Sequence, residues 1–131
     1  MKIAVYGTLR EGHGNHGCLM GSPLVGTCQV YGFDMVTLGG FPAVDFSQDK
    51  ERGITVEVYE CDDEAVARCN RLEGYDPTST YDSFYGRTTI MTEFGEAEMY
   101  YIDKVLEEGY ERIESGDWAD YTGQKRAAYA A

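Results

Sequence analysis

The chain has 131 residues, of which 43% are hydrophobic and 26% charged, and its formal net charge at pH 7 is −12. This length and composition predict one globular domain over residues 1–131. Residues 61–131 hold sixteen acids and seven bases, and such an acidic field opposes binding to nucleic acid or to an anionic membrane. The apolar runs are shorter than the roughly 18 residues that cross a bilayer. Because the N-terminal run is also too short for a signal peptide, a cytoplasmic location is expected.

Motifs for metals and nucleotide cofactors are weak in this sequence. The four cysteines form neither a Cys-x-x-Cys pair nor a Cys/His pattern with zinc spacing. Residues 12–17 match Gly-x-Gly-x-x-Gly, but they follow the first strand only after several residues and do not open a helix pattern. We therefore expect no metal and no cofactor.

The first sixty residues are typical of strands joined by glycine-rich loops. Residues 2–7 predict a buried strand and residues 9–23 a loop. Residues 24–38 are rich in strand formers but interrupted by two glycines, which indicates a bent strand or a hairpin. After a turn, residues 39–46 extend again, and the alternation in 54–60 predicts a strand with one buried face.

A helix pattern follows these strands. Asp62 or Asp63 is a suitable N-cap, and Gly74 is a suitable C-cap. The helix would place Glu73 on the same stripe as Val66 and Cys69. A carboxylate on an apolar stripe is desolvated, which raises its pKa towards the range where a general acid or base works best.

The last third of the chain predicts two more strands and a second helix. Residues 85–94 and 97–102 are separated by Gly95-Glu96 and should pair as an antiparallel hairpin. Residues 104–113 have the spacing of a short helix. With many strands and few crossover helices, the fold expected is α+β: a small mixed β-sheet curling into a barrel and flanked by one or two helices.

Several short segments, in this order along the chain, carry a family resemblance. They are VYGTLREG with Asn15, GGFPAV, RGITVEVYE, NRLEGYDP followed by FYGRTTI, and finally AEMYYI and SGDW. Together they resemble the gamma-glutamylcyclotransferase-like family, which includes gamma-glutamylamine cyclotransferases and the AIG2-like proteins. Val56 departs from the pattern, since the family usually has glycine before the position of Glu57.

The resemblance implies an enzyme that converts a small γ-glutamyl amine or γ-glutamyl amino acid to 5-oxoproline and a free amine. Glu73 matches the family's catalytic glutamate, the general acid/base. The turn formed by Tyr6, Gly7, Thr8 and Leu9 would offer backbone N–H groups to the substrate's α-carboxylate or to the developing oxyanion. Gly7 would let the ligand approach the backbone closely.

Tyr85 occupies the position of the family's Tyr-x-Arg motif. Together with Phe41 and Tyr100, it is expected to line the pocket, while Arg10 and Asn15 are expected to brace the loop. A monomer is expected, because the sequence has no long exposed apolar helix.

Two other classes of function remain open at this point. The same pocket would serve a binding module that holds a small amino compound without turnover. Alternatively, the acidic C-terminal half would serve an interaction protein. The leaving amine is not identified by the sequence.

Overall fold

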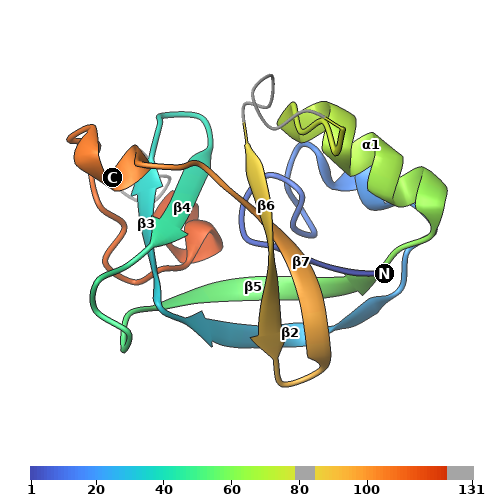
Figure 1. The fold of residues 1–131 in the computed structure, drawn as a ribbon, viewed down its shortest axis with the longest axis horizontal. Coiled ribbons are helices and arrows are strands. Elements are labelled where there is room, and N and C mark those ends of the chain that lie inside the picture. Colours follow the sequence, from blue (N-terminus) through green and yellow to red (C-terminus); the bar gives the residue numbers. More distant parts are fainter. Residues whose placement is uncertain (79–84, 124–131) are drawn as a thin grey trace.

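The computed structural model describes residues 1–78 and 85–123. Its main layer is a five-stranded sheet in the order β2-β5-β1-β7-β6, and β3 and β4 form a separate antiparallel ribbon beside it (Figure 1). The strands are β1 (Lys2–Val5), β2 (Leu24–Tyr31), β3 (Phe33–Thr37), β4 (Pro42–Phe46), β5 (Gly53–Glu60), β6 (Gly86–Thr92) and β7 (Gly95–Tyr101). The helical elements are α1 (Asp63–Glu73), the 3-10 turns η1 (His16–Leu19) and η3 (Val105–Glu107), and residues 118–123.

The sheet is strongly curled, since β6 and β7 cross the direction of β2 and β5 (Figure 1). Strand β1 lies at its centre, antiparallel to β5 and parallel to β7. The two edge strands, β2 and β6, come into contact without a hydrogen-bonded ladder between them. Gly26 of β2 leaves room there for the ring of Phe94. The predicted α+β class with a curling sheet is confirmed, and the described strands stop short of a closed barrel.

The bend predicted within residues 24–38 is confirmed at Gly32. This glycine has a φ of 90° and separates β2 from β3, which belong to different sheets. The predicted hairpin is also present, with Thr92 paired to Gly95. Its turn lies two residues earlier than predicted, because Gly95, at a φ of 103°, closes the turn instead of opening it.

The expectation of one buried face on the strand at 54–60 is wrong, because both faces of β5 are buried. On one face Val56 and Val58 join the cluster around Met35 and Trp118. On the other, Tyr59 packs in the cluster beneath α1 and η1. The polar residues of β5 therefore lie inside the molecule, where their side chains need hydrogen-bond or ion-pair partners.

The helix predicted over residues 104–113 is also wrong. Only Val105–Glu107 forms a 3-10 turn. The segment after it runs along β3, where Thr37 donates to the carbonyl of Glu111 and Ile113 donates to the carbonyl of Met35. This pairing with a strand distant in sequence outweighs local helix propensity, which is a weak preference.

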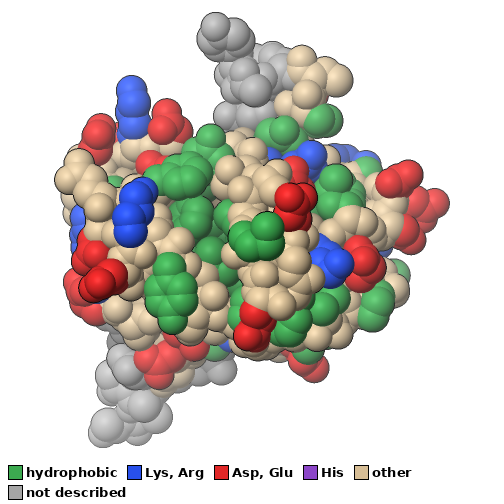
Figure 2. All heavy atoms as spheres, turned by 60° about the horizontal axis from the view of Figure 1, so that its bottom comes forward, with side chains coloured by type: hydrophobic (Ala, Val, Ile, Leu, Met, Phe, Trp, Pro, Cys, Tyr) green, Lys and Arg blue, Asp and Glu red, His purple; other side chains and the backbone are tan. Residues whose placement is uncertain are grey.

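The face of the molecule in Figure 2 carries acidic side chains scattered among basic and hydrophobic ones. In the part of the chain that the structure describes, no helix combines the length and the apolar character needed to cross a membrane. Phe84, the first residue of the FYGRTTI segment, and the end of the predicted domain at 124–131 lie outside the described residues.

Candidate active site

In the loop that follows β1, backbone carbonyl groups accept hydrogen bonds from residues of the same loop. The carbonyl of Gly7 accepts from Arg10 N at 3.0 Å, and that of Thr8 accepts from Asn15 N at 2.9 Å. Asn15 Nδ2 also donates to Thr8 Oγ1 at 2.9 Å. Among the described residues, the N–H groups of Gly7, Thr8 and Leu9 donate to no protein acceptor. Consecutive free N–H groups of this kind favour an anionic or carbonyl ligand.

A buried ion-pair network connects this loop to the rest of the molecule. Arg10 Nε lies 3.1 Å from a Glu57 carboxylate oxygen, and Arg10 Nη1 lies 2.7 Å from Asp117 Oδ1. The second Glu57 oxygen accepts from Glu11 N and from the Tyr59 hydroxyl, both at 2.8 Å. The expected bracing by Arg10 is confirmed, and it links the loop to β5 and to the C-terminal segment.

Gly7 is constrained by a neighbour that the sequence did not indicate. A Cβ at this position would lie 2.6 Å from Cγ and 2.8 Å from Cδ of Pro42, the first residue of β4. Distances under 3 Å are far inside van der Waals contact. The small residue is therefore required for the loop to pack against β4, whether or not a ligand also approaches it.

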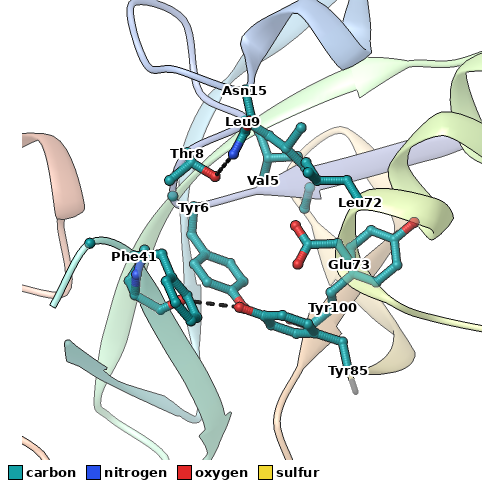
Figure 3. A pocket seen from close by; sticks show the side chains of 14 residues that line it. Val5, Tyr6, Thr8, Leu9, Asn15, Phe41, Leu72, Glu73, Tyr85 and Tyr100 are labelled. Atoms are coloured by element: carbon teal, nitrogen blue, oxygen red, sulfur yellow. Dashed lines mark hydrogen bonds between the residues drawn. The ribbon is translucent and has the colours of Figure 1, made fainter. Parts of the chain in front are cut away.

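Helix α1 brings Glu73 to the same region. Asp62 caps the helix by accepting from Ala65 N at 2.8 Å, as predicted. Gly74 ends it in the left-handed conformation, with a φ of 65°. Glu73 is thus the last helical residue, and Figure 3 shows its carboxyl group turned into a cavity.

Burial makes the Glu73 carboxyl a weaker acid than an ordinary glutamate. Desolvation raises the pKa of its carboxyl from 4.5 to about 7. Burial also raises the pKa of Tyr6 and Tyr85, and their proximity to each other and to Glu73 adds to the Tyr6 effect. At neutral pH the phenols are therefore protonated hydrogen-bond donors, whereas Glu73 can exchange a proton.

The cavity has a volume of about 310 Å³ and is walled mainly by aromatic and aliphatic side chains (Figure 3). All of the sequence-predicted site residues line it: Tyr6, Gly7, Thr8 and Leu9 after β1, Phe41 before β4, Glu73 on α1, Tyr85 before β6 and Tyr100 on β7. The described residues contain no cluster of three or more His, Cys, Asp or Glu side chains suited to a metal ion.

Sequence reasoning missed the other lining residues, which are Ala4, Val5, Asn15, Gly40, Pro42 and Leu72. Pro42 directly follows Phe41 in the GGFPAV segment. Because Phe41 was expected to line the pocket, its position indicated that Pro42 could lie there too. Leu72 adjoins Glu73 but is 41% exposed. With Ala65 and Cys69, the buried residues of α1, it has the i, i+4, i+7 spacing of one helix face, so helix periodicity was a signal that could have found it.

Comparison with known proteins adds independent information. The family model for gamma-glutamyl cyclotransferase, AIG2-like proteins matches residues 3–120. The gamma-glutamylcyclotransferase family protein YtfP of Escherichia coli K12 is 32% identical over 120 residues, which cover 92% of this chain and 97% of YtfP.

Solved structures agree with these matches. A crystal structure of PH0828 from Pyrococcus horikoshii superimposes with a TM-score of 0.78 at 28% identity, covering 97% of each chain. The solution structure of E. coli ytfP gives a TM-score of 0.69 at 30% identity, covering 93% of this chain and 99% of that one. On fold and on sequence over nearly its whole length, the chain belongs to the gamma-glutamyl cyclotransferase, AIG2-like family.

Proposed function

We propose that the protein cyclises a γ-glutamyl amide to 5-oxoproline and releases the free amine. The observation that carries this proposal is the placement of one half-buried carboxyl, Glu73, in the same small cavity as a loop with three free N–H groups. In the reaction, the substrate's α-nitrogen attacks its own γ-carbonyl carbon. A lactam C–N bond forms and the amide C–N bond to the leaving amine breaks.

The reaction needs no nucleophile from the protein, because both reacting groups belong to the substrate. Holding them in a folded geometry contributes on the order of 7–11 kcal/mol to well-oriented intramolecular reactions. The walls of aromatic and aliphatic side chains suit this role, since they enclose the substrate's methylene chain.

What remains for the protein is proton transfer. The substrate's α-ammonium group loses two protons as the lactam N–H forms, and the leaving nitrogen gains two as it departs as an ammonium ion. With a pKa of about 7, Glu73 is ionised often enough to accept a proton and protonated often enough to donate one. One carboxyl therefore serves both halves of the reaction.

The free N–H groups of Gly7, Thr8 and Leu9 provide the second function of the site. They would bind the α-carboxylate of the substrate or the oxyanion that develops on the γ-carbonyl oxygen. The carbonyls of Gly7 and Thr8 already accept from Arg10 N and Asn15 N, and the Leu9 carbonyl lies 2.9 Å from His16 Nδ1. The N–H groups are therefore oriented before the substrate arrives.

The proposal is tested by incubating the wild type and Glu73→Gln with γ-glutamyl-ε-lysine, γ-glutamylalanine and γ-glutamyl-p-nitroanilide. Mass spectrometry should detect 5-oxoproline from the wild type with at least one substrate, and a loss of about 100-fold or more in Glu73→Gln. Glu96→Gln, a change at an exposed glutamate of β7, serves as the matched control and should keep the wild-type rate.

Two outcomes would contradict the proposal. If Glu73→Gln releases 5-oxoproline at the wild-type rate, Glu73 has no catalytic role. If the wild type binds these compounds but releases no product, the chain is a binding module. In either case, hydrogen exchange of the Gly7, Thr8 and Leu9 amides shows whether the loop binds the γ-glutamyl group, since bound N–H groups should be protected.

A further inference from the structure

The Glu73 carboxyl depends on its helix for its position. Among residues 1–78 and 85–123, no group donates a hydrogen bond to it and no cation pairs with it. Its direction is therefore determined by the backbone at the end of α1 and by the walls of the cavity. Helix ends fray readily unless they are fastened, so the contacts around this end decide where the carboxyl lies.

Asn70, one helical turn before Glu73, forms the first of these contacts. Its Oδ1 atom accepts from the Tyr100 hydroxyl at 2.6 Å and from Arg87 Nη1 at 3.1 Å. Tyr100 belongs to β7 and Arg87 to β6. A single side-chain oxygen on α1 is thus tied to two strands of the sheet.

Arg87 also contacts the chain on the other side of Glu73. Its guanidinium carbon lies 4.8 Å from the centre of the Tyr75 ring, which is a cation–π geometry. Arg87 Nε lies 3.5 Å from a carboxylate oxygen of Glu98 on β7. The guanidinium group is therefore fixed to the sheet while it holds residues before and after Glu73.

We infer that Asn70 and Arg87 are positioning residues, which fasten the end of α1 to β6 and β7 so that the Glu73 carboxyl faces the substrate. This inference rests on the proposed function and extends it to side chains that do not line the cavity. The raised pKa of Glu73 is caused by burial. Arg87 therefore affects this carboxyl by fixing where the end of α1 lies, and its own charge is not the cause of the pKa shift. Within residues 1–78 and 85–123, the ionisable groups that interact electrostatically with Glu73 are the phenols of Tyr6, Tyr85 and Tyr100 and the thiol of Cys69.

The deciding variant is Asn70→Leu, which keeps the branching and the number of side-chain heavy atoms but removes the shared acceptor. Asn70→Asp is the conservative counterpart, since it keeps an oxygen within reach of Arg87 and Tyr100. With the best γ-glutamyl substrate of the panel, Asn70→Leu should lower kcat about 10- to 100-fold and change KM less than about 3-fold, because a shift near 1 Å in a reacting group costs rates of this size. Asn70→Asp should recover kcat to within about 5-fold of the wild type.

A second measurement does not depend on turnover. In protein labelled with ¹³C at the glutamate carboxyls, the wild-type Glu73 resonance should titrate near pH 7. In Asn70→Leu its midpoint should fall by about one pH unit or more, as the carboxyl leaves its enclosed site and reaches water. If the wild type releases no 5-oxoproline, the proposed function fails, and this titration alone tests the positioning role.

Arg112→Gln is the control for a general loss of stability. Arg112 is also an ion-paired arginine, 2.9 Å from Asp34, but it does not line the cavity. Its variant should keep the wild-type kcat and the wild-type Glu73 titration. The inference is overturned if Asn70→Leu leaves the Glu73 titration unchanged. It is equally overturned if Asn70→Asp loses as much kcat as Asn70→Leu.

Discussion

Replacing Glu73 with glutamine should make the folded protein more stable above neutral pH while removing its proposed activity. Burial raises the pKa of the Glu73 carboxyl from 4.5 to about 7, so the folded state holds this proton more tightly than the unfolded chain does. The resulting stability is fully present below pH 4.5 and is lost as the pH rises to about 7. Glutamine carries no titratable proton, and the variant avoids that loss.

The size of the effect follows from the two pKa values. The difference between 4.5 and about 7, at about 1.4 kcal/mol for each pH unit, corresponds to about 3 kcal/mol for a fully enclosed group. Glu73 is partly exposed, so water solvates some of the charge, and we expect about 2 kcal/mol. For a chain of this length, that free energy raises the melting temperature by roughly 6–10 °C.

Urea unfolding at pH 5 and pH 8 measures this effect, with fluorescence of the buried Trp118 as the probe. The difference in unfolding free energy between Glu73→Gln and the wild type should grow by about 1.5 kcal/mol between the two pH values, because part of the loss has already occurred at pH 5. Glu96→Gln, at an exposed position, should show no such growth. A difference that is the same at pH 5 and pH 8 would refute the reasoning, because it would mean that the Glu73 charge is solvated in the folded protein.

Two further predictions concern the loop after β1. Gly7→Ala should destabilise the protein by about 1–3 kcal/mol and abolish turnover, because its Cβ would force Pro42 and the loop apart. Gly14→Ala, where a Cβ meets nothing within 4 Å, should change neither the urea midpoint nor turnover. Arg10→Met should cost about 3 kcal/mol by leaving Glu57 buried without its cation, and adding Glu57→Gln should recover part of that loss. If the unfolding free energy lost in the double variant equals the sum of the losses in the two single variants, the two side chains do not interact.

The helix that carries Glu73 could be predicted because its signals are local. Asp62 accepts a hydrogen bond from a backbone N–H three residues later, and Gly74 adopts a left-handed conformation that other residues disfavour. Both effects act within one turn of the chain. The helix ends were therefore predictable without knowledge of the remaining structure.

The resemblance to a known family brought together residues that no local pattern connects. Tyr6, Glu73 and Tyr100 are far apart in the sequence, yet they line one cavity. Periodicity placed Glu73 on a helix face but could not show what that face meets. The order of the motifs supplied that information, while Asn70 and Arg87 were overlooked, since their partners lie on other elements.

The sequence by itself determined the α1 helix with its caps, the β6–β7 hairpin and the α+β class, because capping, turn formation and alternation depend on neighbours along the chain. Only the tertiary structure decided which residues contact across elements. Gly7 is required by Pro42, the polar face of β5 is buried around Arg10, and residues 111–113 pair with β3 instead of forming a helix. In each case the deciding contact joins segments distant in sequence, and its free energy exceeds the small local preferences that a sequence pattern expresses.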